Sequence, residues 1–104
     1  MLYIIYQEDK DDGAAIRAAN RAKHLVYLEQ HKDILLLGGA LLDDDGATRI
    51  GSCLIINVPG RKEAEEFSRN EPFRKAGLFR SVKITRMRRG QWNPTAAPTT
   101  AEGS

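Results

Sequence analysis

Residues 34–58 read ILLLGGALLDDDGATRIGSCLIINV: two apolar runs joined by a polar turn, and this stretch decides the fold. The Asp45-Gly46 pair is typical of a turn between antiparallel strands. The runs 34–42 and 50–58 are therefore predicted to form a hairpin. Because Gly38 and Gly39 interrupt the first run, we expect a bulge there or a close backbone approach that borders a pocket.

The segments on either side of the hairpin each predict one helix and one strand. Before it, residues 2–6 are aromatic and β-branched, as strands are, and residues 14–31 are rich in helix formers. After it, residues 61–70 predict a charged helix, 72–77 a helical turn and 78–88 a last strand. This βαββαβ order predicts a ferredoxin-like α+β fold, a four-stranded antiparallel sheet with two helices on one face.

The predicted strands are apolar on both faces, and two helices can cover only one. In the first strand Leu2, Ile4 and Tyr6 oppose Tyr3 and Ile5. The expected division elsewhere is Ile50, Leu54, Ile56 and Val58 against Cys53 and Ile55, and Leu35 and Leu37 against Ile34 and Leu36. An uncovered apolar face is unusual in a soluble monomer. We therefore expect a homodimer, sheet against sheet, that also frames a sheltered hollow beside a helix histidine.

Length and composition indicate one globular domain. The chain has 104 residues, 41% hydrophobic and 29% charged, unlike a disordered protein. Residues 1–92 are expected to form the domain and 93–104 a flexible C-terminal tail. No run approaches the roughly 20 apolar residues of a membrane-spanning helix, and no secretory signal is recognisable. A lone cysteine, Cys53, forms no internal disulfide, so we expect a cytoplasmic protein without a membrane partner.

The overall charge indicates no particular partner, with 16 basic against 14 acidic residues. The segment 79–104 is locally basic, with Arg80, Lys83, Arg86, Arg88 and Arg89 against one acid. Such a strip can contact anions or simply solubilise the strand and the tail. An RNA-binding module with the same element order would stack bases on aromatic side chains of its central strands, and the run 50–58 has none. We expect no nucleic-acid partner.

The acidic and glycine-rich segments match no metal or phosphate motif. Asp43–Asp45 are adjacent rather than alternating, and no glutamate follows where a calcium loop needs one. Gly38 and Gly39 precede no helix and lack the Lys-Ser/Thr of a phosphate loop. One cysteine supplies no zinc cluster. Neither a metal nor a cofactor is expected.

His24 and Glu71 can carry acid–base chemistry. His24 borders a predicted apolar stripe on the 14–31 helix, formed by Ala15, Ala18, Ala22, Leu25 and Leu28. An imidazole there can reach the crevice between helix and sheet as a general base, or make only a structural hydrogen bond. Glu71, just before Pro72, can orient an imidazole or place a charge at the start of the short helix. His31, at the helix end, is expected to be structural.

Several stretches together resemble the YciI-like family over residues 1–92. They are Arg21, His24, Leu25 and Leu28, then 38–43, Gly51-Ser52, 63–65 and 71–79. The resemblance implies a dimeric α+β barrel, related in fold to muconolactone isomerase-type proteins, and a site that pairs His24 with Glu71. Most members have no assigned reaction, and a few eliminate chloride from chlorinated hydroxyquinone intermediates. Glu71 stands where Asp is usual, and the family's proline near Gly39-Ala40 is absent.

Two functions stay open. The first is a small cofactor-free enzyme in which His24, oriented by Glu71, takes a proton from an acidic C–H or phenolic O–H. Elimination or isomerisation of a cyclic or aromatic metabolite would follow. Arg21, Gly38, Gly39, Ser52 and Phe73 are expected to contact the substrate. The alternative is a non-catalytic accessory protein that binds a small molecule, or another protein, through the same pocket.

Overall fold

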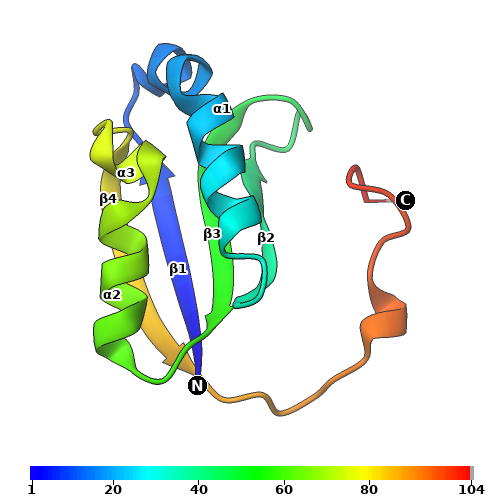
Figure 1. Cartoon of the computed structure of the whole chain (residues 1–104). Helices are drawn as coiled ribbons and strands as arrows, with labels where there is room; N and C mark the ends of the chain where they lie inside the picture. Colours follow the sequence, from blue (N-terminus) through cyan, green and yellow to red (C-terminus); the bar gives the residue numbers. More distant parts are fainter. Residues whose placement is uncertain (104) are drawn as a thin grey trace.

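The elements follow the predicted order in the computed structural model, which describes residues 1–103 (Figure 1). The strands are β1 (Leu2–Asp9), β2 (Leu35–Leu42), β3 (Arg49–Asn57) and β4 (Phe79–Met87). The helices are α1 (Gly13–Gln30), α2 (Arg61–Asn70) and the short α3 (Pro72–Lys75). The predicted hairpin is β2–β3, and its turn is closed by a hydrogen bond of 2.9 Å from the Asp43 N–H to the Thr48 carbonyl.

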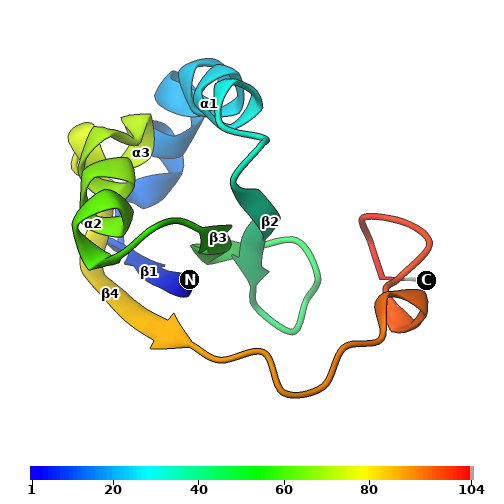
Figure 2. The same ribbon diagram turned by 60° about the horizontal axis from the view of Figure 1, so that its bottom comes forward.

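The four strands form one antiparallel sheet in the order β2-β3-β1-β4. The helices lie together on one face of this sheet, and the C-terminal segment leaves on the other side (Figure 2). The predicted ferredoxin-like arrangement is therefore confirmed. Since β1 and β3 occupy the centre, their side chains form most of the core.

The covered face of the sheet, defined as the face under the helices, holds the hydrophobic core. Tyr3, Ile5, Leu54 and Ile56 are buried there and pack with Phe67 of α2. Burying a large apolar side chain of this kind stabilises a fold by about 1.5–3 kcal/mol. The alternation predicted for β1 and for residues 53–58, which begin in β3 and end just after it, is confirmed, because the core residues alternate there with more exposed neighbours.

Bulges in the β2–β3 pairing overturn two predicted face assignments. Leu35 lies opposite Ile56 whereas Leu37 lies opposite Ile55, so the two leucines are on opposite faces rather than on one. Ile50 has no partner in this register and is 47% exposed, so it does not join the core. An extra residue in one strand reverses the alternation beyond it, and a pattern of period two cannot show where that happens.

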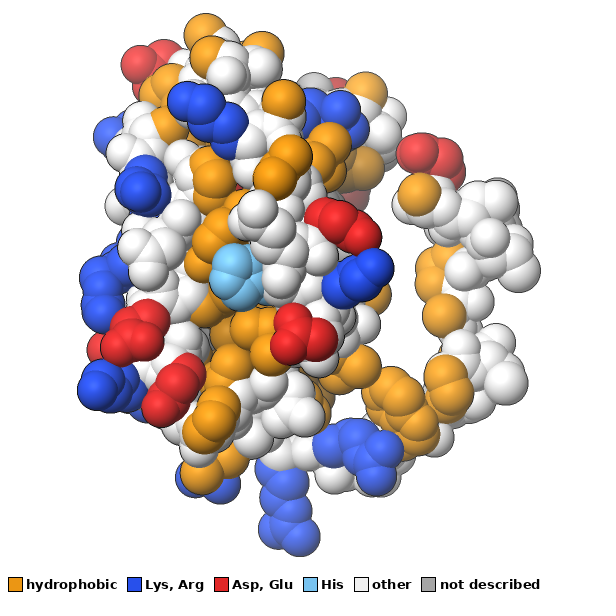
Figure 3. All heavy atoms as spheres, viewed as in Figure 1, with side chains coloured by type: hydrophobic (Ala, Val, Ile, Leu, Met, Phe, Trp, Pro, Cys, Tyr) orange, Lys and Arg blue, Asp and Glu red, His pale blue; other side chains and the backbone are white. Residues whose placement is uncertain are grey.

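The predicted apolar stripe on α1 does not face the sheet. Its alanines are exposed and Leu25 is 47% exposed; only Leu28 packs against the core, beside Tyr27. The polar residues Arg17 and His24 turn inward instead. Alanine side chains offer little area to bury, so the helix loses little by exposing them, and both inward polar groups find partners. Figure 3 shows apolar side chains running between the helices, with charged ones on both flanks.

After β4 the chain extends away from the helices and makes one 3-10 turn, Pro94–Ala96. Residues 85–103 are all exposed, and a gap separates their far part from the body of the molecule (Figure 3). Ser104, the last residue of the expected tail, lies outside the described residues. In the described part of the chain, no helix is long and apolar enough to span a membrane.

Candidate functional site

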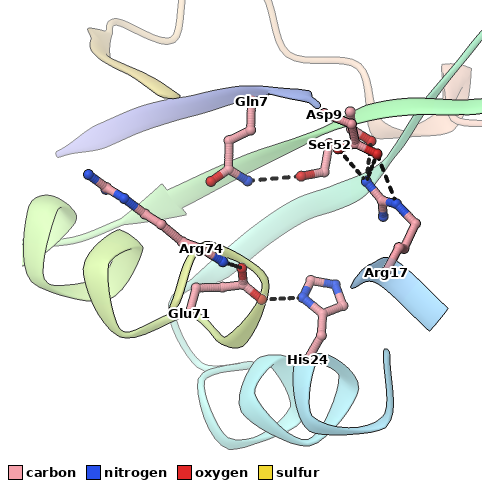
Figure 4. Close-up of polar contacts among 8 residues, drawn as sticks. Gln7, Asp9, Arg17, His24, Ser52, Glu71 and Arg74 are labelled. Carbon is pink, nitrogen blue, oxygen red and sulfur yellow. Dashed lines mark hydrogen bonds and ion pairs between the residues drawn. The ribbon is translucent and has the colours of Figure 1, made fainter. Parts of the chain in front are cut away.

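The side chains of His24 and Glu71 meet at the junction of α1 and α3. His24 Nδ1 contacts Glu71 Oε1 directly (Figure 4). The carboxylate is almost fully enclosed, with 1% of the side chain exposed, and the His24 side chain is 13% exposed. The glutamate side chain, one methylene longer than the usual aspartate, therefore reaches the imidazole.

The local sequence explains how Glu71 is placed. A residue before proline avoids the helical conformation, so Pro72 ends α2 and leaves Glu71 extended, with φ −69° and ψ 130°. Glu71 then caps α3, because its Oε2 accepts a hydrogen bond of 3.2 Å from the Arg74 N–H. Both sequence interpretations hold: one carboxylate oxygen charges the start of the short helix and the other meets His24.

The imidazole ring is held at its edge and on its face. Glu71 engages Nδ1, and Phe73 stacks on the ring with centroids 4.0 Å apart and planes 14° from parallel. When the neutral ring donates Nδ1–H to the carboxylate, its lone pair is on Nε2. Figure 4 shows that this second nitrogen points away from Glu71, toward the side on which Arg17 and Ser52 lie. This arrangement can accept a proton at Nε2.

His24 opens onto a cavity of about 200 Å³ between α1 and the β2–β3 hairpin. The lining includes all five residues expected to contact substrate: Arg21, Gly38, Gly39, Ser52 and Phe73. Glu71 is not in the lining and stands behind the imidazole. The cavity is below the roughly 300–1,000 Å³ of drug-sized ligand sites, so it suits a small molecule.

The residues of a single chain that line this cavity come from α1, β2, β3 and α3. The expectation that a second chain helps to frame the hollow beside the histidine stays a prediction. The cavity lies on the helix side because α1 stands off from β2 and β3 at this point. Gly38 contributes to the close packing, since a Cβ there would lie 2.7 Å from Leu54 Cδ2.

Ser52 brings a hydroxyl group into the cavity wall. Its Oγ accepts a hydrogen bond of 2.8 Å from Gln7 Nε2, and both residues are buried. An amide nitrogen only donates, so the Ser52 proton stays available to a ligand oxygen. The Gln7–Ser52 pair thus places a neutral donor in the same cavity as His24.

Arg17 is a site residue that the sequence analysis missed. Its guanidinium donates hydrogen bonds of 2.9 to 3.1 Å to the two carboxylate oxygens of Asp9 and one of 3.1 Å to the Gly51 carbonyl. It lies 4.9 Å from the centre of the Phe73 ring. Arg17 therefore ties the end of β1 to α1 and supports the ring that stacks on His24.

The sequence did contain a signal for this face of α1. Arg17, Arg21, His24 and Leu28 follow one another at steps of four, three and four, which is one side of a helix, and all four line the cavity. Counting only apolar residues selected the alanine stripe instead. Arg49, at the start of β3, also lines the cavity and was missed.

Tyr27 and His31 support the site from behind. The Tyr27 hydroxyl donates to the Phe67 carbonyl at 2.8 Å. Burial, and then the negative charge of Glu71, raise the pKa of this phenol, so it remains a donor. His31 Nδ1 donates to the Tyr27 carbonyl at 2.8 Å, and the two rings are in contact, which is the structural role expected of His31.

The remaining candidate groups make no comparable site. Arg80 of the basic strip pairs with Glu8 at 2.7 Å on the surface. Cys53 is half-buried in β3, where burial raises the pKa of its thiol. Among residues 1–103, no three His, Cys, Asp or Glu side chains gather as a metal ion would require.

The YCII-related domain family matches residues 1–88. Protein YciI of Escherichia coli O6:H1 is 31% identical over 91 residues, which cover 81% of this chain and 93% of that protein. Protein YciI of Shigella flexneri matches over the same length with the same identity.

Two solved structures share the architecture. One is 5-chloro-2-hydroxyhydroquinone dehydrochlorinase (TftG) from Burkholderia phenoliruptrix AC1100, in complex with 2,5-dihydroxybenzoquinone. It is 37% identical, with a TM-score of 0.79, over 86% of this chain and 96% of that one. The other, an antibiotic biosynthesis monooxygenase, is 16% identical with a TM-score of 0.53, over 88% of this chain and 100% of that one. This second likeness concerns the fold alone.

Proposed function

Because the chain belongs to the YCII-related domain family, we propose that it is a cofactor-free enzyme acting on a small cyclic or aromatic metabolite that bears hydroxyl groups. The reaction is an elimination or an isomerisation begun by proton removal. The observation that carries the proposal is the ring of His24, held at Nδ1 by a buried carboxylate while Nε2 faces a small cavity. A carboxylate in this position fixes the tautomer and stabilises the imidazolium that forms.

The proposed chemistry needs only groups in the cavity wall. His24 Nε2 takes a proton from an acidic C–H or phenolic O–H of the bound ring. The electron pair left behind either expels a leaving group such as chloride or moves the ring's double bond. The proton returns from the imidazolium to solvent after elimination, or to another carbon after isomerisation. The Ser52 hydroxyl donates to the oxygen that gains negative charge.

The similarity to the dehydrochlorinase supports this reaction class. Its name states that it removes hydrogen chloride from a chlorinated hydroxyquinol, and its bound ligand is a single six-membered ring. A cavity of about 200 Å³ accommodates one such ring. We propose elimination from a ring of this kind as the first reaction to test.

We also propose that the protein is a homodimer joined through the open face of the sheet, the face away from the helices. Tyr6 is 46% exposed and Leu37 65% exposed on it, beside Ile4 and Ile55. Apolar area of this kind gains free energy when a second sheet covers it. The catalytic cavity lies on the other face, so each chain would carry its own site.

The proposed function is tested by a screen of chlorinated hydroxyquinols and hydroxylated lactones, with thermal shift for binding and product analysis for turnover. We expect turnover by the wild type and a loss of about 10²–10⁴-fold in His24→Asn. Lys23→Ala, an exposed neighbour on α1, is the matched control and should keep full activity. Circular dichroism and the melting temperature show whether His24→Asn is folded.

The outcomes of the screen separate the two functions. Turnover that survives replacement of both His24 and Glu71 contradicts the proposed mechanism, in which His24 is the base and Glu71 orients it. Ligands that raise the melting temperature without being converted support the alternative, a small-molecule-binding or accessory protein that uses the same pocket.

A further inference from the structure

Three arginines line the cavity beside His24, and only Arg17 has a partner. Arg21 and Arg49 are exposed, and within residues 1–103 neither side chain makes a hydrogen bond, an ion pair or a ring contact. Arg80, which is also exposed, pairs with Glu8. Both guanidinium groups are free to donate at this cavity, and the planar guanidinium fork matches the geometry of a carboxylate and can bind it in bidentate fashion.

A bulge turns Arg49 toward this cavity. The β2–β3 register passes from Leu41 opposite Gly51 to Leu42 opposite Arg49, which skips Ile50. In a regular strand, residues 49 and 52 would point to opposite faces. The bulge instead brings Arg49 to the face of Ser52, and both line the cavity. Bulges commonly re-aim a side chain next to a functional site.

Arg21 reaches the same place from α1, three residues before His24 and on the same side of the helix. A second hollow of about 400 Å³ adjoins the first and shares Arg17, Arg21 and Arg49 with it. The two free arginines therefore border both hollows. No Asp or Glu lines the first cavity, and Asp9, in the second, is already engaged by Arg17. The local field favours an anion.

We propose that Arg21 and Arg49 bind a carboxylate group of the substrate, so that the site takes small cyclic or aromatic carboxylic acids. The inference rests on the proposed function for the placement of the ring beside His24. With its carboxylate held between the two arginines, the ring is oriented with its reacting atom toward Nε2 of His24 and its oxygen toward Ser52. The arginines act on affinity and orientation, and the proton transfer stays with His24.

The test compares two probes that differ by one carboxylate, 2,5-dihydroxybenzoate and 1,4-dihydroxybenzene, by isothermal titration calorimetry. We expect the wild type to prefer the benzoate by about tenfold or more, since hydrogen bonds to charged groups are stronger than those between neutral ones. The double variant Arg21→Gln/Arg49→Gln should lose this preference and bind the neutral probe as before. Arg69→Gln, at an exposed arginine of α2 outside both hollows, is the matched control and should keep it.

Equal wild-type affinities for the two probes would overturn the proposal. A preference that persists in the double variant, or no saturable binding of the benzoate, would do the same. The readout is binding, so it is independent of turnover. If the protein converts no substrate but binds the benzoate preferentially through its arginines, the proposed enzymatic function is refuted. The proposed carboxylate site is supported all the same.

Discussion

The two faces of the sheet differ in what they do with polar groups. Gln7 of β1 and Ser52 of β3 are buried on the covered face, as is Glu71 between α2 and α3, and each has a hydrogen-bond partner. On the open face the same strands present Ile4, Tyr6 and other apolar side chains. Burial with fixed partners gives polar groups the defined orientation that chemistry requires. An exposed apolar surface supports association instead, so the proposed chemistry belongs to one face and the proposed assembly to the other.

Among the variants that test this difference between the two faces, the largest effect on activity is expected at Glu71, next to the covered face. Glu71→Gln keeps an oxygen for the Arg74 N–H but removes the charge that stabilises the imidazolium. We predict a fall in kcat of about a hundredfold with little change in stability. Glu71→Ala should in addition lower the free energy of unfolding by about 1 kcal/mol, because α3 loses its cap. If Glu71→Gln kept the wild-type kcat in steady-state kinetics, the Glu71 carboxylate would have no role in the reaction.

A charge on the open face should break the assembly and leave the site intact. In the proposed dimer Leu37→Glu would bury a carboxylate in an apolar interface, which is strongly unfavourable. We predict a single-chain species in sedimentation at micromolar concentration, with ligand binding at His24 retained. Val26→Glu is the matched control, since Val26 is 57% exposed but belongs to α1. A wild type that sediments as a single chain would refute the dimer.

Gly38 and Gly39 are neighbours in β2, so alanine substitutions at these two positions compare the packing on the two faces of the sheet. A Cβ on Gly38 would lie 2.7 Å from Leu54 Cδ2 in the core, whereas one on Gly39 would meet nothing within 4 Å. We predict that Gly38→Ala lowers the free energy of unfolding by about 1–3 kcal/mol in urea titrations. Gly39→Ala should change it by less than about 0.5 kcal/mol. Equal effects would mean that the faces are not packed as described.

The smallest effect concerns Cys53, which lies on the open face opposite Tyr6. Burial raises the pKa of its thiol, so less thiolate is present near neutral pH and alkylation should be slow there. We predict that iodoacetamide labelling speeds up as pH rises above the usual thiol range. It should be several-fold faster in Leu37→Glu, where no second sheet covers the thiol. Equal rates in both proteins would argue against coverage of this face.

The order of elements could be predicted from the sequence because each relevant signal is local. Apolar runs, Asp45-Gly46 and Pro72 act on their immediate neighbours, and the βαββαβ order follows from them. His24 and Glu71 were both identified as candidates. Whether they meet depends on how α1 packs against α3, which no spacing of 47 residues can show.

Features set by distant partners were predicted less well. α1 turns Arg17 inward because Asp9 is there to receive it, and the apolar pattern of the helix carries no trace of that partner. The bulges at Leu36 and Ile50 leave the composition of β2 and β3 unchanged while reversing the faces of Leu37 and Arg49. The missing information in both cases is a contact between segments far apart in the chain.

The measurement that tests the role of His24 most directly is a long-range ¹H–¹⁵N NMR spectrum of its ring, recorded at a pH where the imidazole is neutral. We predict the tautomer with the proton on Nδ1, held by Glu71, and a bare Nε2 toward the cavity. This preference should weaken in Glu71→Gln. A ring protonated at Nε2 in the wild type would have no lone pair to offer the cavity and would contradict the assignment of His24 as the base.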